Sequence, residues 1–342
     1  MRVPAMLAAV SAAPPGRGRA AKGGQGNRPL VIGCGFIGSH VVAELAADGR
    51  PPVVLTRSQP AGGIAAADLH RGDASDPGEL ERALEGVGHV VYCAGGLLPA
   101  ASEKEPERDA ELTLAPLRAV LDALGSRPET GLTYVSSGGT VYGEPEEVPV
   151  PETAPTLPVG SYGRLHVACE EEIARRREEH DLRARVLRCA TVYGEHQRPD
   201  RGQGAVVTFL HRIEQGLPID LYGGGATVRD YVYAGDVARA LVALIDREEG
   251  PAVLNVGSGE GTSLLDLLRL VETQVGRPAE VRSHPERGFD VHRIVLDTSS
   301  LRGLVEFEPT PLAAGIARTH AWLQAVARSS EAGSRPPLHS AR

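Results

Sequence analysis

The chain has 342 residues, of which 42% are hydrophobic and 23% charged, and its formal net charge at pH 7 is −8. This apolar fraction is ordinary for a globular protein and excludes wholesale disorder. An acidic chain has no overall field that attracts phosphate backbone, and no apolar run reaches the roughly 18 residues of a membrane span, so neither nucleic acid nor a membrane is expected as a partner.

The two ends of the chain indicate where the folded part begins and ends, and the cysteines indicate the cellular compartment. Residues 1–29 hold an apolar piece shorter than the ~7–15 residues of a signal-peptide core, followed by a Pro-, Gly- and Arg-rich stretch. We predict flexible tails at 1–29 and at the polar residues 328–342. The cysteines stand singly within apolar segments, which is typical of buried thiols in a reducing compartment: Cys34, Cys93, Cys169 and Cys189. A cytoplasmic location is therefore expected, and no metal site is.

Short apolar runs alternate with helical patterns through the first half of the chain. Strands are predicted at 30–33, 52–56, 89–94, 132–136 and 185–189, with a further one before Gly72, and helices at 36–48, 76–84, 108–124 and 162–180. Alternating strands and helices form parallel βαβ units with right-handed crossovers. The predicted fold is therefore an α/β doubly wound parallel sheet, with residues 30–190 as a Rossmann domain.

Beyond residue 190 the sequence is richer in Gly and Pro, and its predicted elements are shorter. Helices are expected at 204–215, 235–246, 263–275 and 311–326, and strands near 219–222, 253–256 and 294–296. We assign residues 191–327 mainly to a second, smaller lobe. Some segments, such as 229–257, are expected to return to the first domain.

A glycine-rich loop follows the first predicted strand directly. It reads Gly33-Cys34-Gly35-Phe36-Ile37-Gly38, a GxGxxG pattern at the opening of a helix. In a first βα turn these glycines permit a tight turn, let backbone approach a pyrophosphate and let the helix pack on the strand. The N–H groups and partial positive charge at the helix start favour phosphate. We predict that this loop binds a nicotinamide dinucleotide; a glycine turn without a ligand is the alternative.

The end of the second strand distinguishes NAD from NADP. A carboxylate there, about 20 residues beyond the loop, binds the ribose 2′-hydroxyl of NAD, whereas an arginine accommodates a 2′-phosphate. This chain has Thr56 and Arg57, which weakens NAD and leaves NADP open; a plain exposed charge at Arg57 is the other reading. Asp73 and Ala74 are expected near the adenine, although a turn with a helix cap at Asp76 explains this segment almost as well.

A second polar cluster is predicted where strand 132–136 ends. The segment reads Ser136-Ser137-Gly138-Gly139-Thr140-Val141-Tyr142-Gly143, at the sheet edge where α/β proteins bind ligands. On the next helix, Tyr162 and His166 are four residues apart and so share one face.

These segments resemble the NAD-dependent epimerase/dehydratase family, the extended short-chain dehydrogenases/reductases typified by UDP-glucose 4-epimerase. Further matches are Val192-Tyr193-Gly194, Arg229-Asp230-Tyr231, Asn255-Val256-Gly257 and Arg287-Gly288-Phe289-Asp290. The resemblance extends from Leu30 to about Leu323. It implies a small nucleotide-sugar lobe beside the Rossmann domain and reversible hydride transfer with NAD through a keto-sugar intermediate. It also implies a homodimer built on a four-helix bundle that includes the Tyr162 helix.

The resemblance implies a role for each matching residue. Tyr162 becomes the acid/base, and Ser137 or Thr140 hydrogen-bonds the reacting oxygen. Ala94 and Gly95 join the cofactor contacts, together with Tyr162 and His166. In the family, the residue at the position of His166 is a lysine that charges the tyrosine's surroundings and hydrogen-bonds the nicotinamide ribose.

On the substrate side, the resemblance implies that Arg229 and Arg287 clamp the diphosphate. Guanidinium groups suit this task because they pair bidentately with phosphate oxygens and stay charged. Asp290 matches a position that orients Arg287 or binds the nucleoside ribose. Thr191 and Tyr222 are assigned to the substrate pocket.

Departures from the family pattern bear on activity. The glycine loop is one residue shorter than the usual GxxGxxG, His166 replaces the lysine, and the usual catalytic Ser or Thr position falls on Gly138. Thr113 and Thr191 stand where the family commonly has Asn. A free tyrosine, with a pKa of about 10, needs a positive neighbour to act as a base at pH 7, and histidine, with a pKa of about 6.5, is largely neutral there.

The leading hypothesis is a nucleoside-diphosphate-sugar epimerase in which His166 substitutes for lysine. The alternatives are an NADPH-dependent 4-keto-sugar-nucleotide reductase, favoured by Arg57, an enzyme with a different base, and a catalytically impaired protein that only binds cofactor and sugar nucleotide. A dehydratase is disfavoured because its Asp-Glu pair would stand at Gly139-Thr140. Under the leading hypothesis, His166→Lys leaves activity unchanged or raises it near neutral pH.

Overall fold

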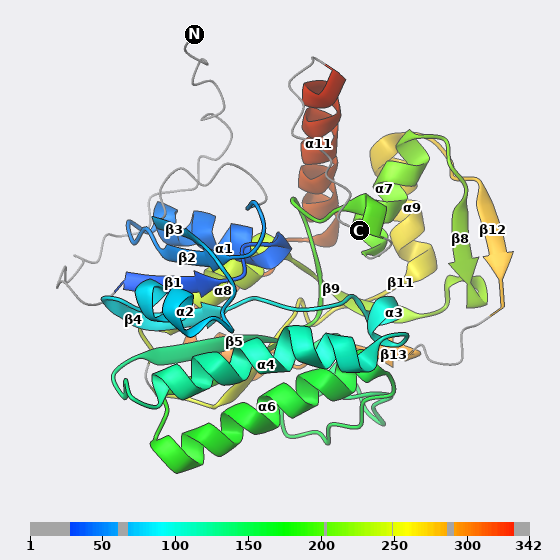
Figure 1. Ribbon diagram of the computed structural model, residues 1–342. Coiled ribbons are helices and arrows are strands. Elements are labelled where there is room, and N and C mark those ends of the chain that lie inside the picture. The colour runs from blue at the N-terminus through cyan, green and yellow to red at the C-terminus, as the bar shows by residue number, and fades with distance from the viewer. Residues whose placement is uncertain (1–27, 61–67, 202–203, 248, 286–290, 332–342) are drawn as a thin grey trace, which may run out of the picture.

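The computed structural model describes residues 28–60, 68–201, 204–247, 249–285 and 291–331. Its central sheet has seven parallel strands in the order β10-β6-β5-β4-β1-β2-β3 (Figure 1). Their bounds are β1 Arg28–Ile32, β2 Val53–Thr56, β3 Asp68–Arg71, β4 Val87–Tyr92, β5 Gly131–Ser137, β6 Ala184–Cys189 and β10 Val253–Val256. The strand order reverses between β1 and β4, which is where a doubly wound sheet opens a crevice for a ligand.

Helices cover both faces of this sheet (Figure 1). On one face lie α1 (Phe36–Ala47) and α8 (Ala234–Ile245); on the other lie α2 (Pro77–Ala83), α4 (Pro106–Leu124) and α6 (Ser161–His180). Along β1, Val31 packs into the α1/α8 core, whereas Leu30 and Ile32 pack into the α4/α6 core. Burial on both faces explains why the strands read as unbroken apolar runs. The predicted doubly wound parallel sheet is confirmed.

Outside the central sheet, short strands and three packed helices form a group of elements with their own core, which we call the second lobe below. One small sheet joins β7 (Thr191–Tyr193), β9 (Val228–Tyr233), β11 (Gly261–Ser263) and β13 (Arg293–Ile294), and a second pairs β8 (Ile219–Tyr222) with β12 (Val281–His284). The helices are α7 (Ala205–Glu214), α9 (Leu264–Val275) and α11 (Leu312–Glu331). Shorter helical segments are α3 (Pro99–Ser102), α5 (Gly138–Val141), α10 (Ser299–Leu304), η1 (Pro199–Arg201) and η2 (Gly223–Gly225).

Most observed elements agree with the predicted ones within two residues at each end. β1 begins at Arg28, inside the segment expected to be a tail, and α11 continues to Glu331, past its predicted end at 326. β9 was recognised only as a motif, because its strand character comes from pairing with β7, β11 and β13, which lie elsewhere in the sequence. Residues 1–27 and 332–342 lie outside the described residues.

Two elements late in the sequence pack on the central sheet and its helices. α8 packs against α1, and β10 pairs in parallel with β6 at the edge of the central sheet. Among the cysteines, Cys34, Cys169 and Cys189 are buried and Cys93 is half-buried, and all four are free thiols. Within the described ranges, no helix is long and apolar enough to cross a membrane.

Candidate active site

The glycine loop between β1 and α1 is held by backbone contacts that leave no room for side chains. Gly33 has φ +88°, and a Cβ on it would lie 2.6 Å from the backbone of Ala94. A Cβ on Gly38 would lie 2.0 Å from the carbonyl oxygen of Gly33. These two glycines are therefore required by the packing of the loop itself.

Gly35 differs from its two neighbours because open space surrounds it. A Cβ on Gly35 would meet nothing within 4 Å, and the same holds for Gly95, which follows β4. α1 begins without a side-chain cap and without an acidic residue in its first turn. Space beside the backbone and an uncapped helix start, both at the β1/β4 crevice, fit the pyrophosphate of a dinucleotide.

Arg57 and Asp73, both predicted to contact the adenosine part of the cofactor, lie close to each other. Arg57 follows β2, and its Nη1 lies 3.6 Å from Oδ2 of Asp73, with both side chains partly exposed. The other Asp73 oxygen, Oδ1, accepts hydrogen bonds from the backbone N–H and the hydroxyl of Ser75, at 2.9 and 2.8 Å. Asp76 caps α2, and Thr56 and Ala74 are buried. Arg57 is therefore held beside a carboxylate at the strand end that selects between NAD and NADP.

Three hydroxyl groups at the end of β5 have different partners. Ser136 Oγ donates to Glu170 Oε1 at 2.5 Å, and Thr140 Oγ1 donates back to the Ser137 carbonyl at 3.2 Å. The half-buried Ser137 hydroxyl makes no hydrogen bond with any residue that the structure describes. Of the two residues proposed to bind the reacting oxygen, Ser137 is thus the one whose hydroxyl remains for a ligand.

Gly138, at the position where the resemblance implies a Ser or Thr, cannot carry a side chain here. A Cβ on Gly138 would lie 2.7 Å from Cδ1 of Leu296 and 2.8 Å from the carbonyl oxygen of Arg188. Contacts below 3 Å with backbone force the chain to move. This packing explains why a hydroxyl at Gly138 is missing and why Ser137 is the candidate that replaces it.

Tyr162 and His166 lie together near the start of α6. Glu103 fixes this helix start, because its Oε2 accepts from the backbone N–H and hydroxyl of Ser161 at 2.7 and 2.6 Å. The two rings meet edge to face, with centroids 4.6 Å apart. Burial raises the pKa of Tyr162 to about 12, and the negative charge of Asp109 adds to the rise.

His166 is a buried, uncharged neighbour of Tyr162. Burial lowers the pKa of His166 to about 4, against a smaller opposing effect of Asp109. The imidazole is therefore neutral at pH 7 and does not supply the charge that a lysine would supply. The catalytic role of His166 stays a prediction, and any such role has to rest on hydrogen bonding.

Asp109 on α4 is a residue of this site that sequence reasoning missed. It is 1% exposed; its Oδ1 accepts from the backbone N–H of Leu97 at 2.7 Å and from the hydroxyl of Thr113 at 3.2 Å. Its Oδ2 is buried and has no partner in the described chain. The signal was an acidic residue on the buried face of α4, one helical turn before Thr113, whose own hydroxyl accepts from the Gly96 backbone at 2.9 Å.

The predicted substrate residues fall into separate parts of the second lobe. Thr191 Oγ1 would lie 3.9 Å from a Cβ on Gly139, which brings β7 beside the end of β5. Arg229 on β9 is half-buried and donates to the Val228 carbonyl at 2.9 Å. Tyr222, at the end of β8, stacks on His284 with ring centroids 4.9 Å apart. Arg287 and Asp290 lie outside the described residues.

Asp230 has a structural role next to Arg229. It is 1% exposed and accepts hydrogen bonds from the backbone N–H groups of Ser258, Gly259 and Leu296. Arg229-Asp230 is therefore no surface ion pair, because the carboxylate points into the protein and organises the turn after β10.

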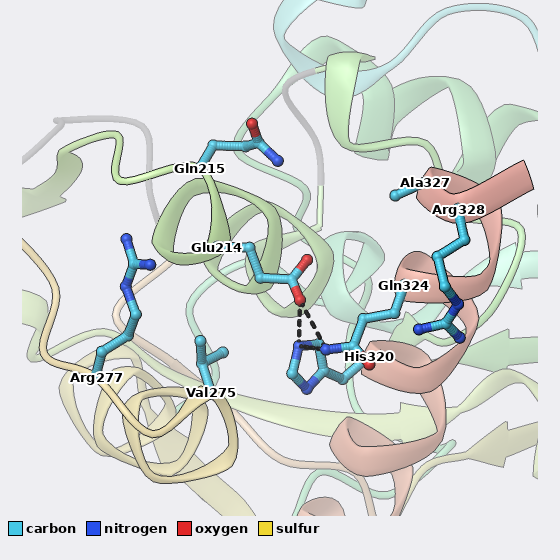
Figure 2. Close-up of a pocket in the computed structure, with 8 residues that line it drawn as sticks. All are labelled: Glu214, Gln215, Val275, Arg277, His320, Gln324, Ala327 and Arg328. Atoms are coloured by element: carbon cyan, nitrogen blue, oxygen red, sulfur yellow. Dashed lines mark hydrogen bonds and ion pairs between the residues drawn. The ribbon is translucent and has the colours of Figure 1, made fainter. Parts of the chain in front are cut away.

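A polar cavity of about 470 Å³ lies away from these residues, between α7, α9 and α11. Figure 2 shows Glu214 at its centre, where Oε1 accepts from Nε2 of His320 at 2.6 Å and from the amide of Gln324 at 3.1 Å. Arg277 and Arg328 also line it. None of the predicted site residues lines this cavity. The hydrogen bonds of Glu214 join α7 to α11. Elsewhere among the described residues, no group of three His, Cys, Asp or Glu is placed to hold a metal ion.

Fold and site together define a dinucleotide-binding protein of the Rossmann class, with a tyrosine-bearing helix that packs against α4, α5 and β5. Residues 30–257 match the model of the NAD dependent epimerase/dehydratase family, and the chain belongs to this family. The predicted family is thereby confirmed.

Curated and solved relatives agree with this assignment. The UDP-glucose 4-epimerase of Mycolicibacterium smegmatis is 32% identical over 306 residues, covering 85% of this chain and 97% of the relative. The structure of UDP-glucose 4-epimerase from Thermotoga maritima with UDP-glucose superposes with a TM-score of 0.82 at 31% identity, covering 88% of this chain and 99% of the other. That of the Thermus thermophilus UDP-glucose 4-epimerase in complex with NAD gives 0.80 at 32% identity, covering 87% and 99%.

Proposed function

We propose that the protein is an NAD-dependent nucleoside-diphosphate-sugar epimerase of the UDP-glucose 4-epimerase kind. The observation that carries the proposal is that the open glycine loop and Ser137 follow parallel strands β1 and β5 at the same edge of the sheet, and that the start of the Tyr162 helix packs on the segment after Ser137, where a Cβ on Gly163 would lie 2.7 Å from the Thr140 carbonyl oxygen. The chain is also similar to such epimerases along most of its length. The same edge holds the β1/β4 crevice, where a dinucleotide and a sugar would lie side by side.

The chain's own residues divide the work at this edge. Gly35, Gly95 and the start of α1 hold the dinucleotide, and Arg229 with Arg287 holds the diphosphate of the sugar nucleotide. When bound, oxidised NAD supplies the hydride acceptor and a positive charge. Ser137 would donate to the reacting sugar oxygen. Tyr162 would take the proton of that hydroxyl as the phenolate and return it as the phenol.

Tyr162 is a poor base in the protein alone. Its pKa is raised to about 12 by burial, and His166 offers no charge to lower it. We therefore expect epimerase turnover to rise as the pH increases above neutrality, because the fraction of phenolate grows with pH.

The decisive experiment is a coupled assay of UDP- and dTDP-sugars with the purified protein, repeated on Tyr162→Phe. We expect interconversion of UDP-glucose and UDP-galactose or a related pair, and a fall in kcat of about 10²–10⁴-fold in the variant, as for loss of a general acid/base. NAD binding should persist in the variant, because the ring is kept. Full activity of Tyr162→Phe, or absence of turnover with every sugar nucleotide, contradicts the proposal.

A specific feature favours a second candidate, an NADPH-dependent reductase of 4-keto-sugar nucleotides. Arg57 stands beside Asp73 at the strand end where an arginine accommodates a 2′-phosphate. Protein purified with tightly bound NAD favours the epimerase, whereas exchangeable NADPH favours the reductase. Arg57→Ala should weaken NADPH selectively in the second case and leave NAD binding nearly unchanged in the first. Sugar-nucleotide binding without turnover of either kind would indicate the catalytically impaired protein.

We also propose a homodimer and a cytoplasmic location. α4 and α6 lie side by side on the outside of the sheet (Figure 1), which is a surface on which two copies can form a four-helix bundle. Charged side chains on this surface form ion pairs within the chain, for example Arg175 with Glu179 at 2.6 Å. Four free thiols agree with a reducing compartment. Light scattering of the purified protein tests the dimer; a monomer at micromolar concentration contradicts it.

A further inference from the structure

A row of four rings runs from the central sheet to the catalytic helix. Tyr92 on β4 and Tyr134 on β5 have centroids 5.9 Å apart, Tyr134 and His166 6.0 Å, and His166 and Tyr162 4.6 Å. Tyr92 and Tyr134 are at most 1% exposed. His166 is therefore enclosed between a buried tyrosine on the sheet side and Tyr162 on the ligand side.

One hydrogen bond joins His166 to this row. The Tyr134 hydroxyl lies 2.8 Å from Nδ1 of His166, and both residues are buried. Burial raises the pKa of Tyr134 well above its usual value, so the phenol keeps its proton. Cys169, three residues after His166 on α6, keeps its proton as well, because burial raises its thiol pKa to about 12.

The protons retained by Tyr134 and Cys169 determine the direction of the hydrogen bond between Tyr134 and His166. A thiol is a weak donor and its sulfur a weak acceptor, whereas the lone pair of a neutral imidazole nitrogen is a good acceptor. If Nδ1 carried the proton and donated it, the buried Tyr134 O–H would be left without a good acceptor, so the Tyr134 O–H donates to Nδ1 of His166. With Nδ1 as the acceptor, the single proton of the neutral imidazole has to sit on Nε2.

We propose that Tyr134 is a positioning residue that fixes His166 as the Nε2–H tautomer, so that the imidazole offers one neutral N–H donor to the bound cofactor. Nε2 makes no hydrogen bond within the described chain, and it is not among the fully buried polar atoms that lack a partner. It is therefore the imidazole nitrogen that remains for a ligand. The proposal rests on the proposed function for the identity of that ligand. His166 then keeps the hydrogen bond that the lysine of the family makes to the nicotinamide ribose, but not its charge.

The groups around His166 support a role without charge. From α4 it faces the buried carboxylate of Asp109, from β5 it faces Tyr134, and on α6 its neighbours are Tyr162 and Cys169. Asp109 favours a protonated imidazole, but burial outweighs it. Binding of a neutral Nε2–H donor is therefore expected to be independent of pH across the physiological range.

The experiment is nitrogen-15 NMR of the full chain labelled at histidine, with and without NAD. The chain has 11 histidines, and His166→Gln identifies the signals of interest. In the wild type we expect unprotonated Nδ1 and protonated Nε2, with no titration between about pH 5 and pH 8. In Tyr134→Phe we expect a mixture of tautomers and NAD binding about fivefold weaker, as for the loss of one hydrogen bond.

Tyr92→Phe is the matched control. It removes a hydroxyl that is also buried in this row but has no hydrogen-bond partner in the described chain. Its tautomer signals and NAD affinity should equal those of the wild type. Equal effects of the two variants would overturn the proposal, because they would indicate loss of packing instead of loss of the hydrogen bond.

The wild-type spectrum decides the tautomer even if Tyr134→Phe fails to fold. Protonated Nδ1, or a titration near the ordinary pKa of histidine, overturns the proposal outright. These readouts need no substrate, so they separate this inference from the proposed function. A fixed Nε2–H tautomer in a protein without epimerase turnover would refute only the latter.

Discussion

Two regions of the candidate active site differ in what defines them. Backbone packing defines the loop between β1 and α1, whereas side-chain contacts define the start of α6. Gly33 and Gly38 are fixed by contacts with backbone atoms, and Gly35 leaves the space that a dinucleotide needs. Tyr162 and His166 instead take their properties from Asp109, Tyr134 and the surrounding burial. The comparison teaches that a glycine loop one residue shorter than the family pattern still leaves open space beside its backbone, whereas a histidine in place of one lysine leaves the surroundings of Tyr162 without a positive charge.

The largest effect is expected in the loop, from Gly38→Ala. Its Cβ would lie 2.0 Å from the Gly33 carbonyl oxygen, so the loop must shift. We expect a loss of about 3 kcal/mol or more in the free energy of unfolding, as for other severe packing changes, and loss of NAD binding. Urea unfolding and NAD titration measure both quantities.

Gly35→Ala is the matched control for this loop. Nothing lies within 4 Å of the added methyl group, so the free energy of unfolding should change by less than about 0.5 kcal/mol. NAD affinity should still fall at least tenfold, because the methyl group occupies ligand space. Equal destabilisation by both variants would contradict the division between structural and ligand-facing glycines.

The next effect concerns the hydroxyl groups at the end of β5. Ser137→Ala should lower kcat about 10²-fold, as for loss of one donor to a reacting oxygen. Thr140→Ala should change kcat only a few-fold, because its hydroxyl is bound to the Ser137 carbonyl. Steady-state kinetics of both variants measure these changes in kcat. A larger loss in Thr140→Ala would reverse the assignment.

A smaller, opposite effect is expected from His166→Lys. An ammonium group beside Tyr162 favours the phenolate and so lowers its pKa, and kcat at pH 7 should stay equal or rise several-fold. His166→Gln is the neutral control and should not shift the pH profile of kcat to lower pH. If His166→Lys abolishes turnover, His166 has a specific role that lysine cannot fill.

The smallest effect is expected from Asp109→Asn. The negative charge of Asp109 contributes to the raised pKa of Tyr162, so its removal lowers that pKa and moves the basic rise of kcat to lower pH. Thr113→Val removes a hydrogen bond of Asp109 but keeps the charge, and its pH profile should match that of the wild type. A shift of the Asp109→Asn profile to higher pH would show that Asp109 acts otherwise.

Local patterns were sufficient for much of the fold and for the outline of the site. The β1-loop-α1 unit, the strand at Ile219–Tyr222 and the spacing of Tyr162 and His166 follow from periodicity and glycine placement within short segments. These signals are local because helix and strand periods are set by neighbouring residues. The assignment of whole segments to two domains stays a prediction.

Other properties depend on partners far away in the sequence. Ser136 is unavailable because Glu170, on α6, accepts a hydrogen bond from its hydroxyl at 2.5 Å. Gly138 has no room because Leu296 and the Arg188 backbone lie against it. Asp109 enters the site from α4, on which sequence reasoning singled out only Thr113. Of these, only Asp109 had a local signal, its place one helical turn before Thr113 on the buried face of α4.

The amino-acid sequence by itself determined the class of fold and the family, and it predicted the dinucleotide loop and the tyrosine proposed to carry the chemistry. Only the tertiary structure decided the state of the residues around that tyrosine: a neutral His166 whose Nδ1 is hydrogen-bonded, and a buried Asp109 whose Oδ2 has no partner among the described residues. The physical reason is that protonation depends on desolvation and on hydrogen-bond partners, and both come from segments that meet only when the chain folds.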